Sequence, residues 1–229
     1  MIIIICGGIG SGKSLTCVKE IVDRGFKTFV NFELCADNIE RLRTEHLFNI
    51  DTETSPKGKI TKTLTLNYDF WKKLAVNNEK FDIALDEFHN VMNSRRAMSK
   101  RNVILSDWLA QIRKILGQSE INNLYIITQK LRRVDVNVRD LAHQCILCQK
   151  VTHDIKVPTI VYENKKYVKK NLPYTIIYKH YFKDAESMSM YENFGMMNGH
   201  IKTTRFFANP YFRYYNSYEL VDFGNDEYV

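Results

Sequence analysis

The feature that most constrains this chain is a glycine-rich segment near its N-terminus, Gly-Gly-Ile-Gly-Ser-Gly-Lys-Ser at residues 7–14. It matches the phosphate-binding pattern G-x-x-x-x-G-K-[ST]. An apolar, β-branched run at 2–6 precedes it and a helix-like segment at 13–22 follows. Backbone N–H groups of such a loop surround phosphate oxygens, and the positive end of the next helix points at the same charge. The flanking strand and helix favour this interpretation over a chance glycine-rich turn.

The residue types in this segment predict their own roles. We expect Lys13 to reach the β- and γ-phosphates of ATP and the Ser14 hydroxyl to ligate Mg²⁺. The residues predicted to bind the nucleotide are Gly7, Gly8, Gly10, Ser11, Gly12, Lys13, Ser14 and Leu15.

Acidic and amide side chains follow two later apolar runs. Asp86 and Glu87 come directly after the run at 81–85, and Gln129 follows the run at 124–128. A strand that ends in Asp-Glu is typical of the Walker B pattern, in which Asp86 orders Mg²⁺ and Glu87 activates the attacking water. Gln129 is predicted to hydrogen-bond the γ-phosphate or that water. The alternatives are an exposed acidic turn and a solvated glutamine.

Strand and helix patterns alternate along residues 1–150. This order predicts an α/β fold, a RecA-like P-loop NTPase core with a mainly parallel sheet. A polar stretch at 51–65 is interpreted as an inserted loop or hairpin. The expected strands are 2–6, 27–32, 81–85, 124–128 and 145–148, and the expected helices are 13–22, 68–74 and 102–116.

From residue 151 to 229 aromatic residues and lysines dominate, and alternation at 174–178 predicts antiparallel strands. We therefore expect two parts: an ATPase core at 1–150 and a small, aromatic, β-rich C-terminal extension at 151–229 packed on it. Aromatic residues at 206–215 either stack on single-stranded bases or close a core or a subunit contact.

Net charge and cysteine content indicate which partners and which cellular compartment suit this protein. The net charge of +7 favours polyanionic partners, and five cysteines form an odd, sparse set that suits a reducing compartment. Cys145 and Cys148 have zinc-like spacing, but a single pair inside a predicted strand favours buried thiols over a metal site. No apolar run approaches the about 18 residues of a membrane span. These features predict a cytoplasmic protein without a membrane span.

The order of these motifs resembles the FtsK–HerA branch of P-loop ATPases. More closely, the chain is similar to the zonula occludens toxin-like ATPases of filamentous phages and the viral genome-packaging ATPases related to them. The segments that carry this resemblance are 9–15, 85–87, 93–95, 107–109, 113–114, 134–135, Arg139 and 215–218. The filamentous-phage proteins continue into a membrane span, whereas this sequence has none, so the resemblance favours packaging over membrane extrusion.

The resemblance also implies oligomeric partners and DNA. An arginine finger from a neighbouring subunit is expected at Arg113, with Arg139 as second choice and a buried ion pair as the alternative for either. Two basic clusters are candidates for sequence-independent DNA contacts, for a subunit interface or for a solvated surface. They consist of Arg95, Arg96, Lys100 and Arg101, and of Lys130, Arg132 and Arg133.

Together these expectations describe a Mg²⁺-dependent ATPase that moves viral DNA, assembled as a ring of about five or six subunits and acting at a capsid vertex or portal, in the host cytoplasm or with the virion. Three alternatives stay open. One is a phage assembly or extrusion ATPase of the zonula occludens toxin type. The second is a thymidine-kinase-like deoxynucleoside kinase. The third is a nucleotide-gated assembly factor that turns over too slowly to drive transport.

Overall fold

The computed structural model describes residues 1–43, 46, 48–54, 60–76, 80–87, 108–109, 111–112, 114, 116 and 121–215. Its centre is one sheet. In spatial order the strands are β10 (His200–Phe207), β9 (Lys166–Phe182), β8 (Gln144–Glu163), β1 (Ile2–Cys6), β7 (Leu124–Thr128), β6 (Phe81–Leu85), β2 (Lys27–Val30) and β3 (Ile39–Arg41).

Strand direction divides this sheet. Every pairing from β8 to β3 is parallel, whereas β8–β9 and β9–β10 are antiparallel. Parallel strands with both faces covered are rich in β-branched residues, as the run at 2–6 is. The predicted α/β class with a mainly parallel sheet is confirmed.

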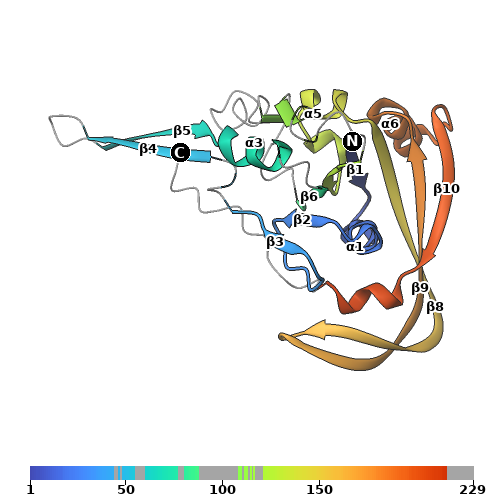
Figure 1. Ribbon diagram of the computed structural model, residues 1–229. Coiled ribbons are helices and arrows are strands. Elements are labelled where there is room, and N and C mark those ends of the chain that lie inside the picture. The colour runs from blue at the N-terminus through green and yellow to red at the C-terminus, as the bar shows by residue number, and fades with distance from the viewer. Residues whose placement is uncertain are drawn as a thin grey trace.

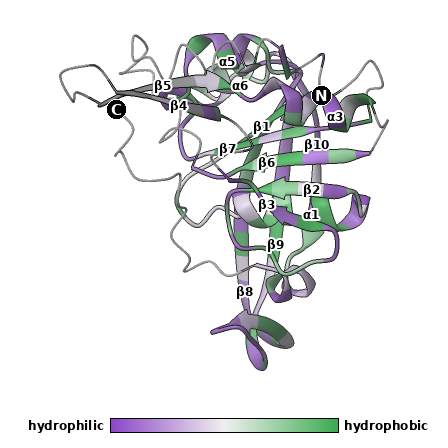
Figure 2. Ribbon diagram, turned by 60° about the vertical axis from the view of Figure 1, so that its left-hand side comes forward, coloured by the Kyte–Doolittle hydropathy of each residue, from purple (hydrophilic) through white to green (hydrophobic). Residues whose placement is uncertain are grey.

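Helices cover both faces of the sheet because successive strand side chains point to opposite sides. Ile3 and Ile5 pack in the cluster that contains α1 (Lys13–Arg24), and Ile2 and Ile4 pack in the opposite one. The second face carries α3 (Tyr68–Val76), α5 (Val136–Asp140) and α6 (Ala185–Phe194). Figure 2 shows the hydrophobic colour along β6 and β7, between these layers.

A long hairpin extends beyond the sheet. β8 and β9 stay paired from Cys145↔Phe182 to Glu163↔Lys166, with an irregularity between His153 and Lys156. In Figure 1 the hairpin continues past the end of β1 and curves beneath α1, beside the short helix η4 (Asn209–Arg213). The boundary predicted at residue 150 falls inside β8, so the two predicted parts share a strand. The division into domains stays a prediction.

Other segments follow the expected pattern. Of the stretch at 51–65, the described residues pair as a hairpin of β4 (Phe48–Thr54) and β5 (Ile60–Leu66). Cys145 and Cys148 are buried in opposite clusters, as residues three apart in a strand should be. Of the helix predicted over 102–116, the described residues Trp108, Leu109 and Ile112 are helical and fully buried.

A buried ion pair joins the C-terminal end of α1 to strand β6 of the sheet. Arg24 Nε donates to Asp82 Oδ2 at 2.7 Å, and Asp82 is wholly buried while a quarter of the Arg24 side chain is exposed. We expect Arg24→Ala to lower the free energy of unfolding by about 2–3 kcal/mol, because Asp82 loses its cation inside the core. Urea denaturation measures this. Lys19→Ala, which removes the more exposed α1 pair with Asp23, is the control and should cost less than about 1 kcal/mol. Equal losses in the two variants would contradict the expectation.

Candidate nucleotide-binding site

The parallel strands bring the predicted site residues to one edge of the sheet. Cys6 pairs with Thr128 and Leu85 pairs with Ile126, so β1, β7 and β6 end side by side. The segments that follow these strands are the glycine-rich loop, Gln129 and the Asp86–Glu87 pair. Ligands of open α/β sheets bind at this carboxyl edge.

The glycine-rich loop has the backbone of a phosphate cradle. Gly12 caps α1 with φ 91°, in the left-handed region that other residues adopt with strain. A Cβ on Gly12 would lie 2.5 Å from Ile177 Cδ1, and one on Gly7 would lie 2.7 Å from the Cys148 carbonyl oxygen. Both glycines are therefore required by space as well as by conformation.

Polar groups in the loop fit a polyphosphate. Lys13 is nearly buried and its Nζ donates to the Gly8 carbonyl at 3.0 Å. Ser11 Oγ is buried and has no hydrogen-bond partner among the described residues. A buried cation, an unpaired hydroxyl and the N-terminus of α1 at one point form a donor set suited to phosphate oxygens.

Ser14 and Asp86 form the candidate Mg²⁺ site. Ser14 Oγ donates to Asp86 Oδ2 at 2.7 Å, which joins the start of α1 to the end of β6. Burial raises the pKa of Asp86, opposed by this bond and by the Glu87 N–H, which donates to Asp86 Oδ1 at 2.7 Å. A hydroxyl beside a carboxylate is the oxygen donor set that Mg²⁺ prefers.

Asn31 is a site residue that the sequence interpretation missed. It follows β2, is buried, and makes two hydrogen bonds with the backbone of Asp86. Its Nδ2 donates to the Asp86 carbonyl at 3.0 Å and its Oδ1 accepts from the Asp86 N–H at 2.7 Å. These bonds hold the Asp86 backbone in place and so fix the position of its carboxylate. The available signal was a polar residue at the end of a predicted strand, at the same edge as the loop.

Glu87 and Gln129 contact each other. Gln129 Nε2 donates to Glu87 Oε1 at 3.1 Å, across the ends of β6 and β7. Glu87 has φ 49°, a left-handed backbone that is unusual for a residue other than glycine. Such conformations cluster at functional sites. The contact orients the predicted base beside the phosphate loop.

The structure also describes Leu15 and the basic cluster that follows β7, which are further predicted site residues. Leu15 is buried in α1, and Lys130, Arg132 and Arg133 follow β7 through the short helix η3 (Leu131–Arg133). Burial raises the pKa of Glu192 on α6, and the nearby charges of Arg132 and Lys130 oppose this.

Arg139 lies on α5, and its Nε is buried without a hydrogen-bond partner among the described residues. Five predicted site residues lie outside the described residues: Arg95, Arg96, Lys100, Arg101 and Arg113.

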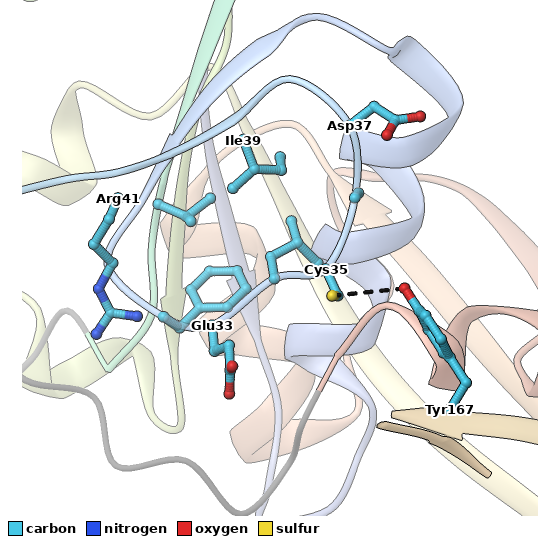
Figure 3. Close-up of a pocket in the computed structure, with 10 residues that line it drawn as sticks. Glu33, Cys35, Asp37, Ile39, Arg41 and Tyr167 are labelled. Carbon is cyan, nitrogen blue, oxygen red and sulfur yellow. Dashed lines mark hydrogen bonds between the residues drawn. The ribbon is translucent and has the colours of Figure 1, made fainter. Parts of the chain in front are cut away.

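A cavity of about 430 Å³ lies elsewhere, between the segment after β2, β3 and the tip of the long hairpin. Figure 3 shows Tyr167 of β9 pointing at Cys35, and its hydroxyl donates to Cys35 Sγ at 3.6 Å. Glu33, Asp37 and Arg41 are among its other lining residues. None of the described residues that line it belongs to the glycine-rich loop, so it is separate from the candidate nucleotide site.

Across the helices that the structure describes, none is both long and apolar enough to cross a membrane.

Comparisons with known proteins agree with the resemblance seen in the sequence. None of the curated proteins matches this chain. Among solved structures, the N-terminal domain of zonular occludens toxin from Neisseria meningitidis is 18% identical, with 91% of this chain and 94% of that chain covered and a TM-score of 0.45. The genome packaging NTPase B204 from Sulfolobus turreted icosahedral virus 2, in complex with ATP-gammaS, is 13% identical, with 81% and 93% covered and a TM-score of 0.39. The family model described as Zonular occludens toxin (Zot) matches residues 1–192, and the chain therefore belongs to the Zot family.

Proposed function

We propose that the protein is a Mg²⁺-dependent ATPase that couples ATP hydrolysis to the movement of viral DNA. The observation that carries the ATPase part is the junction of Ser14 with Asp86, beside a Glu87 that Gln129 holds. A phosphate loop alone binds nucleotide, whereas a loop joined to a carboxylate pair has the groups for hydrolysis.

Each residue of the site has one task in this proposal. The loop N–H groups and Lys13 bind the phosphates, and Ser14 and Asp86 would hold Mg²⁺, which would supply positive charge beside the phosphate oxygens. Glu87 accepts the proton of the attacking water, and Gln129 keeps the Glu87 carboxylate directed at that water. A cation from a neighbouring subunit, Arg113 or Arg139, stabilises charge that develops on the transferred phosphoryl group.

The DNA part rests on charge. The net charge of +7 and the cluster of Lys130, Arg132 and Arg133 at the nucleotide edge favour a polyanion that is bound through its phosphates. A trans-acting arginine requires an oligomer, for which we propose a ring that acts at a capsid vertex or portal. Membership of the Zot family favours the second candidate, an assembly or extrusion ATPase of virions.

Phosphate release by the full chain tests the proposal. With Mg²⁺ and ATP we expect turnover that EDTA abolishes, because Ser14 and Asp86 act through the metal. Duplex DNA should raise the rate several-fold, and this gain should fall with salt as counterions compete for the basic residues. A matched reaction with thymidine in place of DNA tests kinase activity. A rate of hydrolysis that DNA does not change would favour the assembly ATPase. Phosphorylation of thymidine would overturn both candidates.

A further inference from the structure

The base of the β8–β9 hairpin lies directly against the phosphate loop and α1. Cys148 Sγ donates to Thr16 Oγ1 at 3.3 Å, and Lys179 Nζ donates to Glu20 Oε1 at 2.6 Å. Cys148 and Lys179 are opposite each other in the β8–β9 register. Residues that face each other across an antiparallel pair share one side of the ribbon. This side of the hairpin is therefore the one turned to the nucleotide site.

The next pair on the same side is Lys150 and Ile177. Ile177 is fully buried, and its Cδ1 lies 2.5 Å from the point where a Cβ on Gly12 would stand. The Lys150 Nζ lies 4.0 Å from the corresponding point on Gly10. Two residues in the loop thus meet two residues of one cross-strand pair, one apolar and one cationic.

Lys150 has no counter-charge among the described residues, unlike two other lysines of the hairpin. Lys179 is paired with Glu20, and Lys170 is paired with Glu163 near the hairpin tip. Lys150 is exposed and makes no hydrogen bond or ion pair with any residue that the structure describes. Its ammonium lies beside a loop that already carries Lys13 and the positive end of α1, and three positive groups at one place suit an anion.

We propose that Lys150 is a second lysine of the nucleotide site, which contacts the phosphates of bound ATP from the same subunit. This inference rests on the proposed function and adds a residue to it from a strand that carries no phosphate-binding motif. Because the Lys150 backbone is fixed by its pairing with Ile177, its four-carbon stem reaches the loop without any rearrangement of the sheet. The hairpin would then line the side of the site next to Gly10 and Gly12.

The test compares Lys150→Ala with Lys156→Ala, an exposed lysine farther along β8 whose register partner is Pro173. Affinity for a non-hydrolysable ATP analogue with Mg²⁺ is measured by calorimetry, which needs no turnover. We expect Lys150→Ala to weaken binding about 10-fold, the contribution of one charge-assisted contact at an exposed site. Lys156→Ala should match the wild type, and Lys150→Arg should retain most of the affinity. The loss should shrink as salt rises, which a packing defect would not do.

The outcomes separate this inference from the proposed function. If wild type binds the analogue and Lys150→Ala binds within about twofold of it, the Lys150 contact is wrong and the ATPase proposal stands. Equal losses in Lys150→Ala and Lys156→Ala would also overturn the contact, since general charge then accounts for them. If the wild-type chain binds no nucleotide, both proposals fall.

Discussion

Glu87→Gln is expected to reduce ATP turnover about 10²–10⁴-fold, the contribution of a positioned general base. Glutamine has nearly the shape of glutamate but cannot take a proton from water at neutral pH. ATP affinity should stay close to that of the wild type, because Glu87 lies beyond the loop and Ser14 that grip the nucleotide. The variant should therefore accumulate as an ATP-bound form.

Single-turnover phosphate release and analogue binding, measured on the same preparation, check this expectation. Gln129→Ala is the companion variant, because it removes the Nε2 that donates to Glu87 Oε1 at 3.1 Å while leaving the carboxylate in place. It should lower kcat less than Glu87→Gln does. Turnover by Glu87→Gln close to that of the wild type would remove Glu87 as the base.

The loop and the carboxylate pair could be predicted from sequence because each is a local pattern. A β-branched run, glycines at fixed spacing and a lysine specify a strand, a turn and a helix within 24 residues, and the structure has β1 and α1 there. Asp86 and Glu87 follow an apolar run in the same way. Parallel pairing then brings the two patterns together, because strands of one direction end at one edge.

The parts that were missed depend on contacts between distant segments. Asn31 is 55 residues from Asp86 in the chain, and nothing near it in sequence indicates that its amide bonds that backbone. Lys150 lies in a strand whose side toward the loop is set by its register with β9, which alternation alone does not give. Gln129 is predicted to contact phosphate or water, and its described partner is the Glu87 carboxylate.

The basic residues illustrate a second limit. Counting lysines and arginines predicted clusters of one sign, yet Lys130 and Arg132 lie near the acidic Glu192 of α6, more than 50 residues later. An acidic residue from a distant segment thus lies near two residues of this cluster, which the sequence alone does not indicate. DNA contacts by these residues stay a prediction, and their effect on the salt dependence of DNA-stimulated turnover should be smaller than a count of charges gives.

Lys13→Ala should reduce both binding and turnover, the former by at least about 10-fold and the latter by at least about 100-fold. The Lys13 ammonium lies in the loop, where its Nζ donates to the Gly8 carbonyl at 3.0 Å. When ATP binds, the same ammonium is free to turn to phosphate oxygens. Among the described residues, Lys13 is the only cation in the first turn of α1. Loss of a nearly buried cation should leave the fold intact, so melting without nucleotide should change little.

Lys19→Ala is the matched control for this variant, because Lys19 lies on the same helix and is paired with Asp23 away from the loop. It should bind and hydrolyse ATP as the wild type does. Lys13→Arg should rescue little, since a planar guanidinium is wider than an ammonium and Ile177 packs against the loop at Gly12. Glu87→Gln and Lys13→Ala therefore differ in kind: the first separates hydrolysis from binding, whereas the second removes both. Binding of ATP by Lys13→Ala at wild-type strength would show that the loop is not where the phosphates bind, and the assignment of Ser14, Asp86 and Glu87 would fail with it.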